Sequence, residues 1–329
     1  MARAAPEQFT IVIVNYNGGS MLLRCVESVM SSGVMPDKIV LVDNGSRDGS
    51  PNELAERFPV VKIMPTGCNA GFACAANLGL AEAGTDFGII LNNDALLSLE
   101  ALAALADAFA GDPILAIAGG RLVYPDGSPQ NSVAAFPRAA SEVLPKPLRH
   151  RKSGTLSAPY NARGNLVYVE SVVGALFAVR MNQFRSLGGF DEDYFFFLEE
   201  TDLCKRAWDR GFRVAKVENA VATHRQGATA KKYAAGARIE FQRSKLIYFR
   251  KHCRRPLYLL MCAVLPIKAL INALGSFLIC LTTLFMRPDA RRKARESAAV
   301  LAWYAMFCPQ TWGLPDKCSQ KARAKASQP

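Results

Sequence analysis

The chain has 329 residues, half of them hydrophobic and 21% charged, which suits one large α/β domain with an appendage and excludes a fibrous or low-complexity protein. Charge is uneven, because residues 225–329 hold 20 Lys and Arg against 4 Asp and Glu, whereas residues 1–224 have a net charge of −4. A basic tail on an acidic body predicts a polyanionic partner, and basic residues beside apolar runs favour anionic lipid over nucleic acid.

Strands and helices alternate through residue 118. Strands are predicted at 9–14, 38–42, 60–64, 87–91 and 114–118, and helices at 22–30, 52–58, 73–83 and 99–109. Alternation at this spacing predicts βαβ units and a mainly parallel, Rossmann-like sheet. Because ligands of such sheets bind beyond the carboxyl ends of the strands, the polar loops 15–19, 43–46 and 92–94 should converge on one crevice.

The middle of the chain adds less regular elements. Residues 124–168 are rich in Pro, Ser and Arg and predict a long excursion that borders the site. Residues 169–179 read as two strands with a turn at Gly174 and Ala175. A helix is predicted at 199–210, closed by Gly211, and a strand at 212–217, with His224 on the loop beyond it.

An unusual acidic cluster lies between 188 and 202. Its five carboxylates are interleaved with the aromatic run 194–197 and belong to Asp191, Asp193, Glu199, Glu200 and Asp202. Aromatic side chains favour burial whereas unpaired carboxylates resist it, so the segment is expected to line a cleft. The alternative is a helix N-terminus whose acids complement the helix dipole and pair with Lys205 and Arg206.

The last hundred residues have a different character. A basic amphipathic stretch at 238–251 precedes two apolar runs, 257–265 and 269–286, which Pro266 and Lys268 interrupt. Basic residues flank both ends and argue against a single membrane crossing. We therefore predict a helical hairpin bent at Pro266, or a helix pair lying in the membrane interface; the alternative is a buried hairpin of a soluble protein. Residues 298–308 form another short apolar piece.

The cysteines and the N-terminus suggest a cytosolic setting. Nine cysteines are scattered without a CxxC pair, which predicts reduced, mostly structural thiols rather than a disulfide framework or a zinc site. The N-terminal MARAAPEQFT lacks an apolar core, so no signal peptide is expected. The predicted organisation is a domain at 1–235, a helical, basic, membrane-associated region at 236–314 and a disordered tail at 315–329.

Taken in order, the motifs resemble those of an inverting GT-A glycosyltransferase of family 2, in its bacterial rhamnosyltransferase-like branch. The resemblance covers about residues 8–230. The matching stretches are IVIVNYN (11–17), IVLVDNGSRDGS (39–50), NAGFACAANLG (69–79), LNNDALL (91–97), VGALFAVR (173–180), GGFDEDYFFFLEETDLCKR (188–206) and HRQGAT (224–229). Each motif is weak alone, whereas the ordered set is highly specific.

The resemblance implies a donor site. Asp43 would hydrogen-bond the nucleobase of a nucleotide sugar, and the other expected donor contacts are Asn15, Asn17, Asn44, Asn77, Asn92 and Asn93. Asp94 matches the aspartate that binds Mg²⁺ or Mn²⁺ in the family's DxD-type motif, and His224 matches a histidine that completes this metal site. Asn92 and Asn93 stand where many members have acids, so a single carboxylate remains at the motif.

The resemblance also implies a catalytic base and an acceptor side. The base is usually the aspartate of an acidic pair, which here reads Glu199-Glu200. Helical spacing puts Glu199 and Asp202 on one face and Glu200 on another, so spacing alone does not choose. Alignment favours Glu200 as the catalytic base, with Glu199 second and Asp202 also a candidate. Gly174, Ala175 and Asp191 are expected to contact the acceptor.

The expected activity is transfer of a sugar, rhamnose from dTDP-rhamnose, to a lipid-linked or cell-envelope polysaccharide at the cytoplasmic face of the membrane. A same-fold transferase using a UDP-hexose or UDP-galactofuranose is the closest rival. A non-catalytic, membrane-bound binding module is a second, and the presence of Asp43, Asp94, Glu200 and His224 speaks against it. A nucleic-acid-binding protein is a third, but the basic tail lacks the interleaved aromatics that stack bases.

Overall fold

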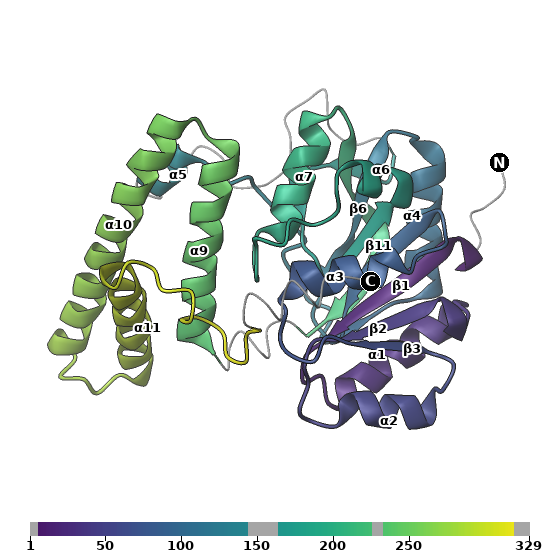
Figure 1. Cartoon of the computed structure of the whole chain (residues 1–329), viewed down its shortest axis with the longest axis horizontal. Coiled ribbons are helices and arrows are strands. Elements are labelled where there is room, and N and C mark those ends of the chain that lie inside the picture. Colours follow the sequence, from purple (N-terminus) through teal and green to yellow (C-terminus); the bar gives the residue numbers. More distant parts are fainter. Residues whose placement is uncertain (1–5, 144–163, 226–232, 319–329) are drawn as a thin grey trace.

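The computed structural model describes residues 6–143, 164–225 and 233–318. Within these ranges, an α/β unit is built on a nine-stranded sheet (Figure 1). The strand order is β3-β2-β1-β4-β10-β6-β11-β5, and β8 pairs with β11. Its strands are β1 Phe9–Asn15, β2 Ile39–Asp43, β3 Lys62–Pro65, β4 Phe87–Asn92, β5 Ala95–Leu96, β6 Leu115–Val123, β8 Leu166–Tyr168, β10 Leu176–Arg180 and β11 Arg213–His224. A small second sheet pairs β7 Val133–Ala134 with β9 Ser171–Val172.

The helices of the α/β unit pack on both faces of the sheet. They are α1 Ser20–Ser31, α2 Ser50–Arg57, α3 Phe72–Ala81, α4 Leu99–Gly111, α6 Met181–Ser186 and α7 Glu199–Asp209, joined by the 3₁₀ turns η1 Pro6–Gln8 and η2 Pro36–Lys38. Side chains from α1, α2 and α4 form one core cluster with the sheet, and those from α3, α6 and α7 form the other. Coverage of both faces explains the continuous apolar run of β1, whose residues 9–13 are all buried.

The parallel part of the sheet is as the sequence predicts. β1 runs parallel to β2 and β4, and β2 runs parallel to β3. β10 then inserts antiparallel between β4 and β6. In register, Asn15 on β1 lies opposite Asp43, and Val14 lies opposite Asn92. The three polar loops therefore leave the same edge of the sheet, which confirms that they lie close together, while the predicted crevice stays a prediction.

A helical region follows the α/β unit. It contains α9 Ala234–His252, α10 Arg255–Thr282 and α11 Pro288–Ala305, and the short helix α5 Ala139–Val143 contacts α10 from the middle of the chain (Figure 1). α10 is continuous through Pro266, so the predicted bend at that residue is wrong. The chain reverses after Thr282 instead. Met261, Leu265 and Ala269 on the buried face of α10 pack on neighbouring helices, and this packing outweighs the single backbone hydrogen bond that proline removes.

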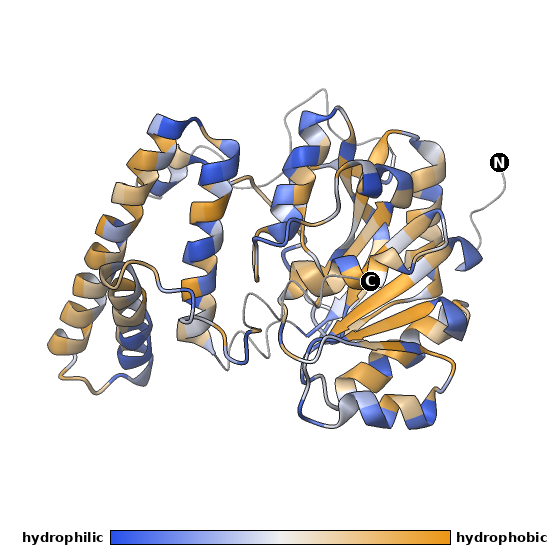
Figure 2. Ribbon diagram, viewed as in Figure 1, coloured by the Kyte–Doolittle hydropathy of each residue, from blue (hydrophilic) through white to orange (hydrophobic). Residues whose placement is uncertain are grey.

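The outer face of α10 is apolar and exposed. It is the one described helix with the length and composition of a membrane-crossing segment, and 17% of its most apolar window is buried. Figure 2 shows the hydrophobic colour along this helix. Its exposed large apolar side chains include Leu259, Leu260, Ile267, Ile271, Leu274, Phe277, Leu278 and Leu281. This face supports association with a membrane.

The segment after α11 returns to the α/β unit. Cys318 and Cys68 form a disulfide that joins positions 250 residues apart. The predicted reduced state is therefore wrong for this pair, and the other seven cysteines, all within the described ranges, are free. Residues 315–318 are ordered, contrary to their assignment to a disordered tail, whereas 319–329 lie outside the described residues. Sequence separation hid the pairing, because only the fold brings the two cysteines together.

Candidate active site

Asp94 and His224 meet at the carboxyl edge of the sheet. β11 extends to His224 and pairs antiparallel with β5, so His224 ends a strand rather than lying on the predicted loop. This pairing brings the Nε2 atom of His224 to 3.2 Å from Oδ1 of Asp94 and to 3.3 Å from the side-chain nitrogen of Asn92. Residues 226–229 of the HRQGAT motif lie outside the described residues.

Gln130 orients His224 and is a residue that the sequence did not single out. Its Oε1 lies 2.7 Å from Nδ1 of His224, and its side-chain nitrogen donates to the His224 carbonyl oxygen at 3.2 Å. Both residues are buried. With Nδ1–H donating to Gln130, Nε2 is left to accept from the Asn92 amide and lies beside Asp94. Gln130 belongs to the irregular segment after β6, where no periodicity marks a functional position.

The pair suits a divalent cation that also binds a substrate. Asp94 and His224 offer one carboxylate and one imidazole nitrogen, both of which are common ligands of divalent metals. Among the described residues, no three or more His, Cys, Asp or Glu side chains come together as a complete metal site, and Asp94 and His224 are only two. Two protein ligands leave the remaining coordination positions to a phosphate-bearing ligand and water.

The loops after β1 and β2 form the adjoining part of the crevice edge. Asn15 is fully buried and accepts a hydrogen bond from Asn93 at 2.7 Å. It donates to the hydroxyl groups of Ser46 and Ser50, while Asp43 accepts the Ser46 N–H at 3.1 Å. These bonds fix the β1 and β2 loops together and bring Asn15, Asp43 and Asn93 to one place.

Asn17 stabilises the same pair of loops by its backbone conformation. It adopts a left-handed conformation with φ of 54°, which asparagine tolerates better than most residues. Its Oδ1 accepts the N–H of Arg47 at 2.8 Å, and its own N–H donates to Ser46. The predicted nucleotide contact by Asn17 therefore stays a prediction, next to an observed role in loop closure.

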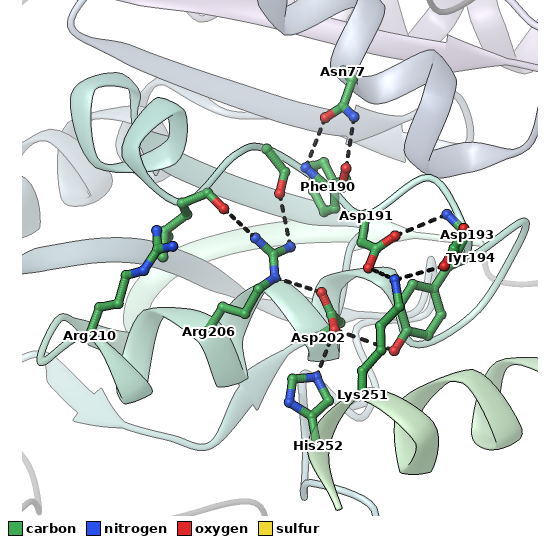
Figure 3. Close-up of polar contacts among 12 residues, drawn as sticks. Asn77, Phe190, Asp191, Asp193, Tyr194, Asp202, Arg206, Arg210, Lys251 and His252 are labelled. Carbon is green, nitrogen blue, oxygen red and sulfur yellow. Dashed lines mark hydrogen bonds and ion pairs between the residues drawn. The ribbon is translucent and has the colours of Figure 1, made fainter. Parts of the chain in front are cut away.

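Two other predicted donor contacts have structural partners instead. Asn44 is buried, donates to Oδ1 of Asn69 and accepts the Ala70 N–H, so it joins the loops after β2 and β3. The Asn77 amide is held by both backbone groups of Phe190, at 2.8 and 2.9 Å (Figure 3). Asn77 thus attaches the segment after Gly189 to α3. The predicted nucleotide contacts by these two side chains also stay predictions, beside their observed structural roles.

Glu200 lies in the first turn of α7, beside Gly174. Phe197 and Leu198, just before the helix, have φ of 71° and 67°, a strained backbone that such residues adopt mainly at functional sites. The Glu200 carboxylate accepts N–H groups from Gly174 and the start of α7, and burial, the largest influence, raises its pKa. Its Oε2 is out of contact with solvent and has no hydrogen-bond partner. This atom therefore has hydrogen-bond acceptor capacity that no group of the described residues fills.

A short backbone path connects Glu200 to the Asp94 loop. Gly174 donates to Glu200, and the next residue, Ala175, accepts the backbone N–H of Asn92 at 3.2 Å. The turn between β9 and β10 therefore links the Glu200 carboxylate to the end of β4, which precedes Asp94. Ala175 is fully buried, and the acceptor contacts predicted for Gly174 and Ala175 stay predictions.

The remaining acidic candidates occupy an ion-pair network with α9. Asp202 is 1% exposed and receives Arg206 and His252, each at 2.7 Å, and the Tyr194 hydroxyl at 3.3 Å (Figure 3). Burial raises the pKa of Asp202, but the His252 hydrogen bond and the Arg206 charge outweigh it and hold that pKa below its usual range. A carboxylate so paired is a poor proton acceptor.

Asp191 belongs to the same network. Its carboxylate contacts Lys251 of α9, which also reaches Asp193 at 2.9 Å. These contacts give Asp191 a partner on α9 and leave its predicted acceptor role without support from geometry. Glu199 is 4% exposed at the start of α7. The cluster thus contains Glu200 beside Gly174, Glu199 buried next to it, and a set of three, Asp191, Asp193 and Asp202, that fastens α7 and its preceding segment to α9.

Comparison with known proteins identifies the family of the chain. Residues 10–177 match the family model of glycosyl transferase family 2, and residues 162–228 match the N-terminal domain of galactosyltransferase. An N-acetylglucosaminyl-diphospho-decaprenol L-rhamnosyltransferase of Mycobacterium tuberculosis is 31% identical over 232 residues, which cover 65% of this chain and 75% of that protein. An O-antigen chain rhamnosyltransferase of Salmonella typhimurium is 25% identical over 240 residues, covering 72% and 70%.

Solved structures show the same fold. The mannosyltransferase PcManGT from Pyrobaculum calidifontis, in complex with GDP-Man and Mn²⁺, superposes with a TM-score of 0.53 over 92% of this chain and 88% of its own, at 18% identity. GalNAc-T7 with UDP, GalNAc and Mn²⁺ gives a TM-score of 0.53 over 73% and 49%, at 19% identity. These similarities identify the α/β unit as a GT-A-like fold.

Proposed function

Because the chain belongs to glycosyltransferase family 2 and is a glycosyltransferase, we propose that it transfers rhamnose from dTDP-rhamnose to a lipid-linked or cell-envelope polysaccharide acceptor, with inversion at the anomeric carbon. Two relatives that match over most of this chain are rhamnosyltransferases by name. One of those names specifies a lipid diphosphate acceptor, and the exposed apolar face of α10 supports an acceptor at a membrane.

Asp94 and His224 would hold Mg²⁺ or Mn²⁺ against the donor diphosphate. Such a cation neutralises charge that develops on the leaving diphosphate. Gln130 keeps the Nε2 lone pair of His224 directed at this position. Asn15, Asp43 and Asn93 form the neighbouring edge where the nucleoside would lie, with Asp43 accepting a base N–H group.

Glu200 would act as the general base. Its Oε2 takes the proton from the acceptor hydroxyl as the oxygen of that hydroxyl attacks the anomeric carbon, and the bond from this carbon to the diphosphate oxygen breaks. Attack opposite the leaving group inverts the centre and requires a single base. The raised pKa of Glu200 makes it a better proton acceptor than an ordinary carboxylate.

One observation carries the proposal. Glu200 has a buried, unpartnered carboxylate oxygen, and the Gly174–Ala175 turn joins it to the strand end that bears Asp94. Oε2 of Glu199 is likewise buried without a hydrogen-bond partner among the described residues, so what favours Glu200 over Glu199 is its bond to Gly174, the residue next to Ala175. We propose that the donor sugar and the acceptor hydroxyl lie between Glu200 and Asp94, as a one-base displacement requires.

A second donor class is favoured by a different observation. Residues 162–228 match a galactosyltransferase domain, and this range contains Gly174, Glu200 and His224. The rival activity is transfer from a UDP-hexose or UDP-galactofuranose by the same residues. It changes the nucleotide and the sugar, whereas the base and the metal ligands stay the same.

The test is transfer to a synthetic N-acetylglucosaminyl diphospho-lipid, with Mn²⁺ or Mg²⁺ and either dTDP-rhamnose or a UDP-hexose as donor. Formation of an inverted rhamnosyl product, lost on chelation of the metal and in the Glu200→Gln variant, supports the proposal. If the enzyme turns over only with the UDP-hexose, the donor is a UDP-hexose and not dTDP-rhamnose. Absence of transfer and of hydrolysis with every donor refutes the catalytic proposal.

A further inference from the structure

Residues 312–318 form a strap between the helical region and the α/β unit. Figure 1 shows the chain after α11 running back toward the sheet. There the Asn69 N–H donates to the Asp316 carbonyl at 3.1 Å, and the Cys318 N–H donates to the Asn69 carbonyl at 2.9 Å. The Cys68–Cys318 disulfide fixes the same contact covalently. The strap is thus attached beside the loop that follows β3.

Asp316 contacts two residues of the loops proposed to bind the nucleoside. Its Oδ2 accepts the Tyr16 hydroxyl at 2.9 Å, and its Oδ1 pairs with Arg47 at 3.1 Å. Tyr16 directly follows Asn15, and Arg47 lies four residues after Asp43. Burial, and then the hydrogen bond to Asp316, raise the pKa of Tyr16 to about 12. One carboxylate from the C-terminal part of the chain therefore holds both loops.

The other side of the strap is fastened to α9. The Leu314 N–H donates to Oε1 of Glu240 at 3.1 Å, and Lys317 forms an ion pair with the same, fully buried carboxylate. The Lys317 ammonium also lies 4.7 Å from the centre of the Phe195 ring. Leu314 and Lys317, on either side of Asp316 in the sequence, are thus bound to α9, and Cys318 is bound to Cys68. These contacts hold the Asp316 backbone in place.

We propose that the strap is the outer wall of the nucleoside part of the donor site, and that Asp316 is a positioning residue that acts through Tyr16 and Arg47. This inference rests on the proposed function. The Tyr16 ring and the Arg47 guanidinium are flat groups suited to contact a nucleobase or ribose. Asp316 fixes their orientation before the donor arrives, which lowers the entropy cost of binding.

The disulfide makes this wall sensitive to reduction. A dithiol reductant transfers two electrons and two protons to the Cys68 and Cys318 sulfurs, the S–S bond breaks, and the reductant becomes a disulfide. Two free thiols then remain, and the strap keeps only its hydrogen bonds and ion pairs. Reduction should therefore loosen Asp316 and weaken binding of the nucleoside.

The experiment measures binding of dTDP and of inorganic pyrophosphate, each with Mn²⁺, to the full chain by calorimetry. The Asp316→Ala variant, and the wild type after treatment with a dithiol, should bind dTDP about tenfold more weakly, the loss expected from one charged hydrogen-bonding group. Pyrophosphate has no nucleoside, so its affinity should not change. In turnover, the KM for the donor should rise while kcat stays constant.

Matched variants separate positioning from folding. Asp316→Glu should restore part of the dTDP affinity, whereas Asp289→Ala, which removes an exposed acid paired with Arg292 on α11, should bind like the wild type. The Cys68→Ser/Cys318→Ser variant should be insensitive to the dithiol. Unchanged or tighter dTDP binding in both Asp316→Ala and the reduced protein overturns the inference and leaves the donor site intact. A wild type that binds neither dTDP nor UDP overturns the inference together with the proposed function.

Discussion

Glu200 is the residue whose loss should stop transfer without loss of the donor. Glu200→Gln keeps the size of the side chain but cannot accept a proton, so kcat should fall about 10²- to 10⁴-fold. Binding of dTDP with Mn²⁺ should stay within twofold or so of the wild type. Glu199→Gln is the matched control, one residue away in the same first turn of α7. If Glu199→Gln loses activity and Glu200→Gln keeps it, Glu199 is the catalytic base instead of Glu200.

Burial of Glu200 also has consequences for pH. The base must be ionised, so kcat should fall as the pH decreases through the pKa of Glu200, which burial raises above the ordinary 4.5. The same shift affects stability, because the neutral carboxyl is favoured in the fold and this contribution disappears as the pH rises through the folded pKa. Glu200→Gln, neutral at every pH, should gain melting temperature relative to the wild type as the pH rises from the ordinary carboxyl pKa through the raised pKa of Glu200. A difference that shrinks with pH would contradict the burial argument.

Gln130 should act on the metal site through His224. Gln130→Leu removes the amide that fixes the imidazole ring and should lower Mn²⁺-dependent dTDP affinity about 10- to 100-fold, the usual effect of losing an outer partner of a metal-binding histidine. Affinity in the absence of metal should not change. Titration of Mn²⁺ at fixed dTDP measures the effect, and equal losses with and without Mn²⁺ would indicate general damage to the fold.

At the scale of elements, the contact between α7 and α9 depends on Asp202. Asp202→Asn leaves Arg206 and His252 without their shared carboxylate, and breaking a buried pair of this kind costs about 3–5 kcal/mol of unfolding free energy. Because the pKa of Asp202 is held below its usual range, its stabilisation is present above the unfolded pKa and is lost as the pH falls through the folded one. Urea unfolding at pH 7 and at acidic pH should show the two proteins converge. Equal stability at pH 7 would refute this role.

The elements also show how far the sequence alone can lead. The strands β1, β2, β3 and β4 and their loops were predictable, because β-branched runs ending in polar residues specify both the strands and the edge where they end. The division of the acidic cluster was not, since helical spacing does not reveal that Lys251 and His252 approach from α9. Gln130, the Cys68–Cys318 disulfide and the continuity of α10 through Pro266 likewise depend on packing between segments far apart in the chain.

For the whole molecule, the exposed face of α10 should bind anionic vesicles. Ile271, Leu274 and Leu278 are 62%, 60% and 59% exposed. Replacing all three by Glu should lower affinity for phosphatidylglycerol vesicles by roughly a hundredfold or more, since each buried apolar side chain contributes about 1.5–3 kcal/mol. Met35→Glu, at 60% exposure directly before η2, is the matched control and should have no effect. Sedimentation with vesicles provides the measurement, and full binding by the triple variant would exclude α10 as the membrane-binding element.

The two attachments of α9 limit how the molecule can move. His252 is held by Asp202, and Glu240, twelve residues earlier, is held by the strap, so the fixed points are about 18 Å apart along the helix. A helix attached at one point can rotate about it, whereas attachment at two separated points fixes the orientation of α9 relative to the α/β unit. A bilayer that binds α10 would therefore hold the crevice at one height above the lipid headgroups. If the acceptor is anchored in that bilayer, the enzyme would select it by the distance of its hydroxyl group from the membrane, and longer or shorter glycans would present theirs at the wrong level.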